Sequence, residues 1–208
     1  MEKTARGTLI VLGSVAMVAV LAGVAVATVA TMSRESLSIQ LDDSPFSCAS
    51  GIATDWESDD EVILPAIVLT EDLDCTLRFR ASNDGALPVD VTRITIPMLG
   101  PGTGGSVKVV QLDGDFGSAT PREASNVEPD DIDAVLQLAE PLSLDPGESM
   151  LFTATLAFSP DGCTGENSTT YMGRAPDATV TALGIAGTRD GTAGGYAFIG
   201  TADSSCDS

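Results

Sequence analysis

The chain contains no histidine, and aromatic residues are scarce: six Phe, two Tyr and one Trp in 208 residues. Without histidine, neither a Ser–His–Asp nor a Cys–His catalytic arrangement can form, and His-ligated metal sites are excluded. A glycoside hydrolase would need paired carboxylates in a cleft, which is usually lined by more aromatic rings than this chain offers. We therefore expect no enzyme: no catalytic residues, no metal site and no cofactor.

Basic residues are also few. Ten Lys and Arg stand against 30 Asp and Glu, which gives a formal net charge of −20. A nucleic acid carries charge of the same sign and would be repelled, so we expect no nucleic-acid partner. Such acidity suits export into high salt, and a genome biased towards Arg and Asp would give the same composition.

The acidic residues gather at three places in the sequence. These groups are Asp55, Glu57, Asp59, Asp60 and Glu61 around Trp56; Asp113 and Asp115; and Asp130, Asp131 and Asp133. Carboxylates are typical Ca²⁺ ligands, but residues 55–66 fail the EF-hand template, because Asp60 stands where that loop needs Gly. We interpret the three groups as a solvated acidic surface.

Charged residues are absent from Thr8 to Met32, a run of 25 residues. At about 1.5 Å per residue, a helix of this length crosses a hydrocarbon core of roughly 30 Å. Lys3 and Arg6 precede the run, which favours a cytoplasmic N-terminus. We predict a cytoplasmic segment 1–7, a transmembrane helix or signal anchor over 8–32 that binds the membrane, and an extracellular domain over 33–208.

A cleaved signal peptide is the alternative reading of this segment. Ala25-Val26-Ala27 and Thr28-Val29-Ala30 both resemble small-residue cleavage sites. The apolar run is longer than the roughly 7–15 residues usual in a signal peptide, which favours the retained anchor. The predicted location is therefore the cell membrane, with a single pass; a secreted protein is the alternative.

Small residues recur every four positions within the apolar run, at Ala19, Gly23, Ala27 and Thr31. This spacing places them on one face of a helix, where another helix can approach closely. The face indicates a protein partner or self-association, although a segment so rich in Ala and Val also produces such runs by chance.

The residues around Gly7 bear a family resemblance. Ala5-Arg6-Gly7 followed by Thr8-Leu9-Ile10-Val11 resembles the junction between basic leader and hydrophobic helix in archaeal pilins and archaellins. In that family a peptidase cuts just before the helix, and the helices bundle into a filament core with a β-sandwich outside. The resemblance implies an alternative function as a pilin-like filament subunit. The chain departs from the family in having one basic residue beside Gly7.

Beyond Arg34 the apolar residues alternate with polar ones, which is typical of half-buried strands. Asn83-Asp84-Gly85 predicts a hairpin turn, and a change of apolar phase predicts a β-bulge near Thr92. About eight to nine short strands with Gly, Pro and Asp between them favour an all-β sandwich. The predicted strands are 37–41, 61–69, 75–81, 88–97, 106–112, 132–138, 150–158, 178–185 and 195–201.

Residues 142–158, LSLDPGESMLFTATLAF, resemble the Pro-Gly turn and core strand of bacterial and archaeal Ig-like surface domains. Residues 82–85 with Val89-Asp90-Val91 resemble the earlier hairpin of such domains. The resemblance implies an Ig-like β-sandwich and carries no function with it. An outer domain held by a membrane anchor, without catalytic residues, leads us to expect a structural or adhesive binding role in the cell envelope.

All four cysteines, Cys48, Cys75, Cys163 and Cys206, lie on the predicted outer side, where an even number favours two disulfides. Of three pairings we prefer Cys48–Cys75 and Cys163–Cys206, because each closes a loop local to one end of the chain. Asn167-Ser168-Thr169 forms an N-glycosylation sequon, a triplet that is also common by chance.

Overall fold

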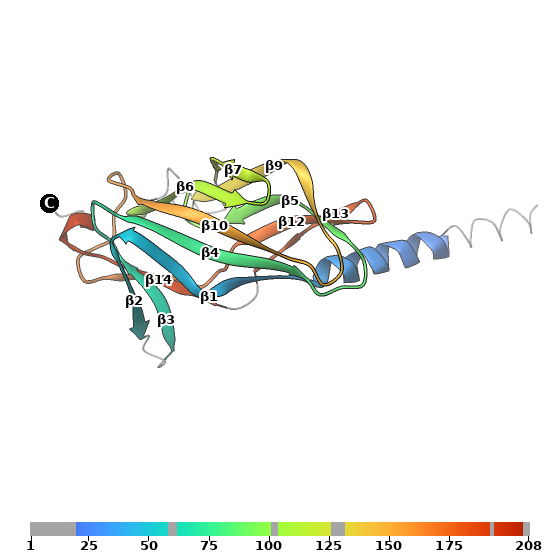
Figure 1. The fold of residues 1–208 in the computed structure, drawn as a ribbon, viewed down its shortest axis with the longest axis horizontal. Coiled ribbons are helices and arrows are strands. Elements are labelled where there is room, and N and C mark those ends of the chain that lie inside the picture. The colour runs from blue at the N-terminus through green and yellow to red at the C-terminus, as the bar shows by residue number, and fades with distance from the viewer. Residues whose placement is uncertain (1–19, 58–61, 101–103, 126–131, 192–193, 206–208) are drawn as a thin grey trace, which may run out of the picture.

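The computed structural model describes residues 20–57, 62–100, 104–125, 132–191 and 194–205. Within them, an α-helix over residues 20–35 leads into an elongated β domain (Figure 1). The domain has fourteen described strands and one 3₁₀ helix: β1 (Leu37–Ser50), β2 (Ile52–Glu57), β3 (Ile63–Val68), β4 (Asp74–Asn83), β5 (Val89–Ile96), β6 (Val107–Gly114), β7 (Gly117–Ala119), β8 (Arg122–Ser125), β9 (Ile132–Leu144), β10 (Ser149–Phe158), β11 (Thr169–Met172), β12 (Asp177–Ala182), β13 (Ile185–Arg189), β14 (Tyr196–Ile199) and η1 (Ala202–Ser204). The predicted all-β class is confirmed.

The described strands form three sheets. Sheet 1 has the order β1-β4-β10-β6-β7, sheet 2 the order β13-β12-β5-β9-β8, and sheet 3 the order β11-β14-β3-β2. Neighbours pair antiparallel, apart from the parallel pair of β14 with β3. Each of the nine predicted strands overlaps an observed one, and the five that the sequence did not reveal are β2, β7, β8, β11 and β13.

Alternating side chains from sheets 1 and 2 form one hydrophobic core, to which sheet 3 also contributes. On β10, Met150, Phe152, Ala154 and Leu156 are at most 7% exposed, as the alternation predicts. The Phe79 and Phe152 rings stack at 5.3 Å between centroids. Burying side chains of this size contributes roughly 1.5–3 kcal/mol each, which makes the core the main source of stability.

The predicted bulge is confirmed on β5. Consecutive residues Thr179 and Val180 of β12 pair with Arg93 and Val91, which leaves Thr92 as an extra residue on β5, so the inward phase changes there. Val91 on one side and Ile94 on the other are both at most 2% exposed. The bulge therefore keeps both halves of the strand facing the core.

The predicted hairpin at Asn83-Asp84-Gly85 is wrong. β4 belongs to sheet 1 and β5 to sheet 2, so this turn carries the chain across the core. Asn83 is 0% exposed, and its amide nitrogen donates to the carbonyls of Leu87 and Leu144, both at 2.9 Å. Its side-chain oxygen accepts from the backbone nitrogen of Gly85 at 3.0 Å. The Asn-Asp-Gly sequence does mark a turn, but the Asn83 side chain forms its hydrogen bonds within the crossover between the two sheets.

Within the described ranges, no helix combines the length and the hydropathy needed to span a membrane. The helix over residues 20–35 continues the predicted apolar segment, whose first part, residues 8–19, lies outside the described residues.

Candidate functional site

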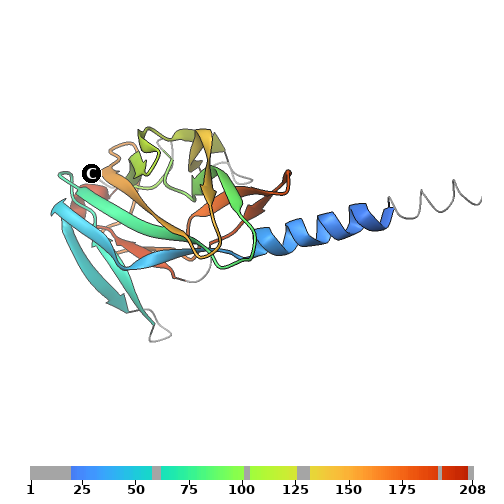
Figure 2. The same cartoon turned by 45° about the vertical axis from the view of Figure 1, so that its right-hand side comes forward.

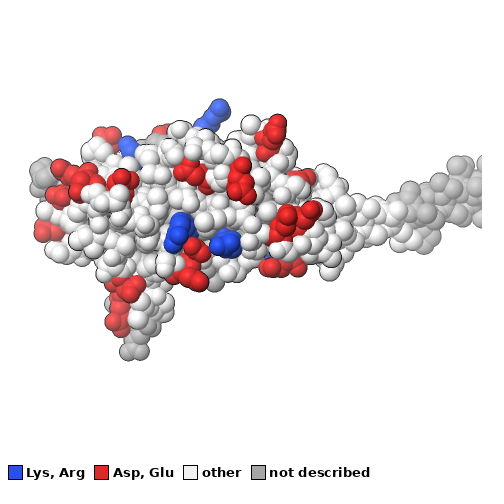
Figure 3. All heavy atoms as spheres, viewed as in Figure 1, with Lys and Arg blue, Asp and Glu red and all other residues white. Residues whose placement is uncertain are grey.

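The helix over residues 20–35 projects from one end of the domain (Figures 1 and 2). At about 100° per residue, its large exposed apolar side chains spread over roughly two thirds of the circumference, and Gly and Ala occupy the remaining side. They are 42–65% exposed: Val20, Leu21, Val24, Val26, Val29 and Met32. A helix that is apolar all round is normally buried in a protein core or a membrane. Carboxylates are scattered over the face of the domain that Figure 3 shows, whereas the first acidic residue of the helix is Glu35, at its end.

The helix joins β1 without a linker, because only Ser36 separates residue 35 from Leu37. The Ser36 nitrogen donates to the Met32 carbonyl at 3.1 Å, and its hydroxyl donates to the Ser33 carbonyl at 2.6 Å. The Ser36 carbonyl accepts from the backbone nitrogen of Asp84 at 3.1 Å. The residue that ends the helix is thereby tied to the turn that crosses between the sheets.

Two arginines complete this junction. The guanidinium of Arg34 donates to the Ala186 carbonyl on β13 and, at 3.1 Å, to the Thr31 hydroxyl. From the opposite direction, Nε of Arg189 on β13 donates to the Leu37 carbonyl at 2.9 Å. A positive side chain in the last turn also interacts favourably with the helix dipole. The helix is thus attached to both β1 and β13, which fixes its direction relative to the domain.

The small-residue face predicted on the helix is open where the structure describes it. Gly23 has no neighbouring heavy atom within 4 Å of an added Cβ, and Ala27 is exposed. Thr31 lies at the junction, where its hydroxyl accepts from Arg34. Ala19 lies outside the described residues. The face therefore has room for a partner helix on the N-terminal side of Thr31.

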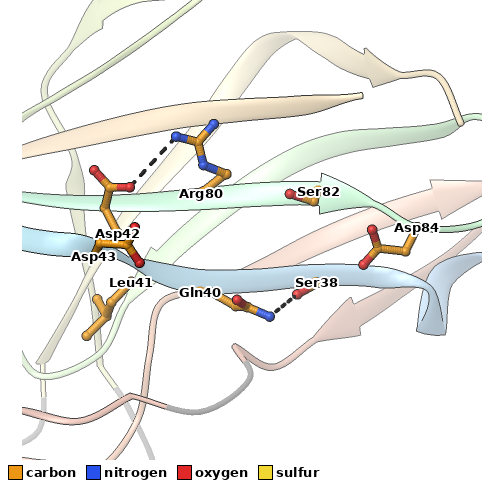
Figure 4. Close-up of a pocket in the computed structure, with 8 residues that line it drawn as sticks. All are labelled: Ser38, Gln40, Leu41, Asp42, Asp43, Arg80, Ser82 and Asp84. Carbon is orange, nitrogen blue, oxygen red and sulfur yellow. Dashed lines mark hydrogen bonds and ion pairs between the residues drawn. The ribbon is translucent and has the colours of Figure 1, made fainter. Parts of the chain in front are cut away.

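A polar hollow of about 410 Å³ lies on the outer face of β1 and β4 (Figure 4). One Asp42 carboxylate oxygen lies 3.7 Å from Arg80, and the other lies 3.6 Å from Arg78. Nearby, the Gln40 amide donates to the Ser38 hydroxyl at 2.8 Å. The lining residues are Ser38, Gln40, Leu41, Asp42, Asp43, Arg80, Ser82 and Asp84.

A wide bulge in β1 builds one wall of this hollow. Leu41 pairs with Phe79 and Phe46 with Leu77, so residues 42–45 stand opposite Arg78 alone. The Arg78 guanidinium donates to the Ser44 carbonyl at 2.6 Å, which holds the bulge against β4. The hollow offers carboxylate, amide and hydroxyl groups that can hydrogen-bond a small polar molecule. Sequence analysis did not identify it, because the predicted strand ended at Leu41.

The acidic groups identified in the sequence stay at the surface where they are described. On β2, Asp55 and Glu57 are exposed, while Asp59, Asp60 and Glu61 lie outside the described residues. Among the described residues, no three His, Cys, Asp or Glu side chains are grouped closely enough to hold a metal ion.

The other two acidic groups include carboxylates with local structural partners. Asp113 accepts from the Gln111 amide at 2.9 Å, and Asp115 is exposed. Asp133 accepts from the backbone nitrogen of Met98 at 3.0 Å. This contact supports a left-handed residue, since Met98 has φ of 58°. Asp130 and Asp131 lie outside the described residues.

The predicted Cys48–Cys75 disulfide is confirmed. The two residues are register partners on β1 and β4, with Cα atoms 3.9 Å apart. The chain between them forms the hairpin of β2 and β3, which leaves the body of the domain (Figures 1 and 2). The bond therefore closes the base of that hairpin. Cys163 is also disulfide-bonded; its predicted partner, Cys206, lies outside the described residues, so that pairing stays a prediction.

Two buried ionisable groups lie away from the hollow. Asp177 is 7% exposed and accepts from the Gly191 nitrogen at 3.3 Å and from Arg174 at 3.2 Å. Burial raises the pKa of this carboxyl, and the Gly191 and Arg174 donors offset part of that rise. Burial also raises the pKa of Tyr196, which is 0% exposed. Both groups belong to the packing of the domain.

Comparison with known proteins adds little to this description. No protein-family model matches the chain, and none of the curated proteins matches it. Among solved structures, the chain is similar to one described as "AvmM Catalyzes Macrocyclization in Alchivemycin A Biosynthesis", with a TM-score of 0.33 and 11% identity. The match covers 69% of this chain and 89% of that one. A similarity this low carries no argument about activity.

Proposed function

We propose that this chain is a membrane-anchored extracellular protein with a structural or adhesive binding role in the cell envelope. The N-terminal apolar segment would hold it in the bilayer, with the β domain outside. The observation that carries the proposal is the helix over residues 20–35, which exposes apolar side chains all round yet is firmly attached to the domain. Leaving that surface in water is unfavourable, and lipid would cover it.

Three features support the rest of the proposal. Arg34 and Glu35 are the first charged residues after the apolar run, as expected where a chain emerges from a bilayer. The Cys48–Cys75 disulfide fits an oxidising compartment outside the cytosol. Two antiparallel sheets around one core suit an Ig-like surface domain. The absence of histidine from the whole chain favours a binding role over catalysis.

Fractionation with protease treatment of intact cells tests this function. We expect the chain in the membrane fraction, the β domain cleaved from outside, and a protected fragment that contains residues 8–32. Mass spectrometry of that fragment identifies its ends. A freely soluble chain, or a β domain protected from external protease in intact cells but cleaved after lysis, would overturn the proposal.

A second candidate is a pilin-like filament subunit, favoured by the open face at Gly23 and Ala27. Small residues there would allow helices of neighbouring copies to pack closely in a filament core. N-terminal sequencing of the mature chain separates the two candidates. A chain that starts at Thr8 and forms filaments in electron micrographs supports the second; a chain that starts at Met1 supports the simple anchor.

A further inference from the structure

The loop before β11 contains Asn167, whose side-chain amide takes no part in holding the fold together. Asn167 is exposed, and among the described residues its amide group has no hydrogen-bond partner. Only the backbone of the loop is fixed: the Asn167 nitrogen donates to the Gly200 carbonyl at 3.1 Å, and the Gly200 nitrogen donates to the Ser168 carbonyl at 2.8 Å. The side chain is therefore free to carry a substituent without disturbing the fold.

Asn83 provides the contrast within the same chain. Asn83 is 0% exposed, and its side-chain amide makes four hydrogen bonds that hold the crossover between sheets 1 and 2. The third asparagine, Asn126, lies outside the described residues, and only Asn167 is followed two positions later by Ser or Thr. The one asparagine in a sequon is thus an accessible one.

The backbone conformation at position 167 offers a simpler explanation of why an asparagine stands there. Its φ of 58° lies in the left-handed region, which Asn tolerates better than most residues. That explanation accounts for Asn167 but requires nothing of Thr169, whose hydroxyl is what completes a sequon. Thr169 begins β11, an edge strand of sheet 3, where valine would fit equally well. Residue 169 therefore separates the two explanations.

We propose that Asn167 carries an N-linked glycan, added from a lipid-phosphate-linked sugar. In that transfer, the Asn167 Nδ2 forms a bond to the sugar C1 and loses one proton. The bond between C1 and the lipid phosphate oxygen breaks, and the phosphate leaves with the electron pair. The loop lies beside η1, since the Thr164 nitrogen donates to the Ser204 carbonyl at 2.8 Å. Both ribbon views place η1 at the end of the domain remote from the helix. The glycan would therefore cover the end of the domain that lies farthest from the helix.

This inference rests on the proposed function, because the transfer takes place on the exported side. The test uses the full chain purified from membranes of the cells that naturally produce it, analysed by mass spectrometry of a peptide spanning Asn167. We expect a mass excess of one or more sugar residues, localised to Asn167 by fragmentation. An unmodified Asn167 in a chain whose β domain is cleaved by external protease overturns the inference while the proposed function stands.

Matched variants of the two neighbouring residues complete the test. Thr169→Val removes the sequon hydroxyl and keeps the strand, so the mass excess should disappear. Ser168→Ala leaves the sequon intact, so the excess should remain. An excess that persists in Thr169→Val would show that the added mass is not an N-linked glycan on this sequon, and the inference would be wrong. Because the unaltered chain is measured directly, a variant that fails to fold does not decide the outcome.

Discussion

The guanidinium group of Arg34, in the last turn of the helix, donates a hydrogen bond to the backbone carbonyl of Ala186, 152 residues later in the chain. This contact and that of Arg189 with the Leu37 carbonyl join the first strand of sheet 1 to an edge strand of sheet 2 beside the helix. The direction of the helix is therefore set by the folded domain as a whole.

Replacing Arg34 with Ala should loosen this junction. The substitution removes both donors to Ala186 and Thr31, and we expect the free energy of unfolding to fall by about 1 kcal/mol. Amide hydrogen exchange in detergent should accelerate for residues 33–37. Arg122→Ala, at an exposed position on β8, is the control and should leave that exchange unchanged. Equal exchange rates in the Arg34 variant would mean that the helix is positioned by other contacts.

Removing the disulfide with the double substitution Cys48→Ala and Cys75→Ala should destabilise the domain by about 3–4 kcal/mol. The bond closes a loop with a sequence separation of 27 residues, and that value follows from the chain entropy it removes from the unfolded state. Urea unfolding of the wild type and the variant, without reductant, measures the difference. A loss below about 1 kcal/mol would show that the hairpin base is held mainly by the ladder between β1 and β4.

Asn83→Ala should cost about 2–4 kcal/mol of unfolding free energy, because it leaves the Leu87 and Leu144 carbonyls without their donor inside the protein. Asp84→Ala is the matched control, since Asp84 is an exposed neighbour in the same turn. Thermal unfolding should show a clearly larger drop in Tm for the Asn83 variant. Similar values for the two variants would contradict the role assigned to Asn83.

Asp177→Asn should change how stability depends on pH. Burial raises the pKa of Asp177 above 3.8, so the folded state binds its proton more readily than the unfolded state does. The stabilisation from this group is greatest below pH 3.8 and is lost as the pH rises through the folded pKa. The stability of the variant relative to the wild type should therefore increase from pH 3 to pH 7. Parallel stability curves in urea titrations would rule out this effect.

The central strands could be predicted from the sequence, whereas five of the six edge strands, all except β1, could not. β10 is buried on one side along most of its length, so its apolar residues alternate clearly. The five strands that were missed, β2, β7, β8, β11 and β13, all lie at sheet edges. An edge strand has a partner on one side only and needs fewer buried residues, so its alternation is weak. On β2, for example, Trp56 is the only residue that is even partly buried.

Features that depend on contacts between distant parts of the chain could not be predicted from the sequence. The pairing of Cys48 with Cys75 could be predicted because loop length is visible along the chain. The hollow beside Asp42 could not, because it depends on how residues 42–45 bulge against β4, and Asp-Asp-Ser-Pro reads as a break in the strand. The junction at Arg34 was missed for the same reason, since its partner on β13 is distant in sequence.

The continuity of the helix with β1 has a mechanical consequence. Nine register pairs join β1 to β4, and the last of them lie next to the Cys48–Cys75 bond. Hydrogen bonds in an antiparallel ladder run perpendicular to the strands, so a pull along the helix loads them in shear rather than one at a time. Tension applied through the helix would thus be shared by many bonds before it reaches the covalent link.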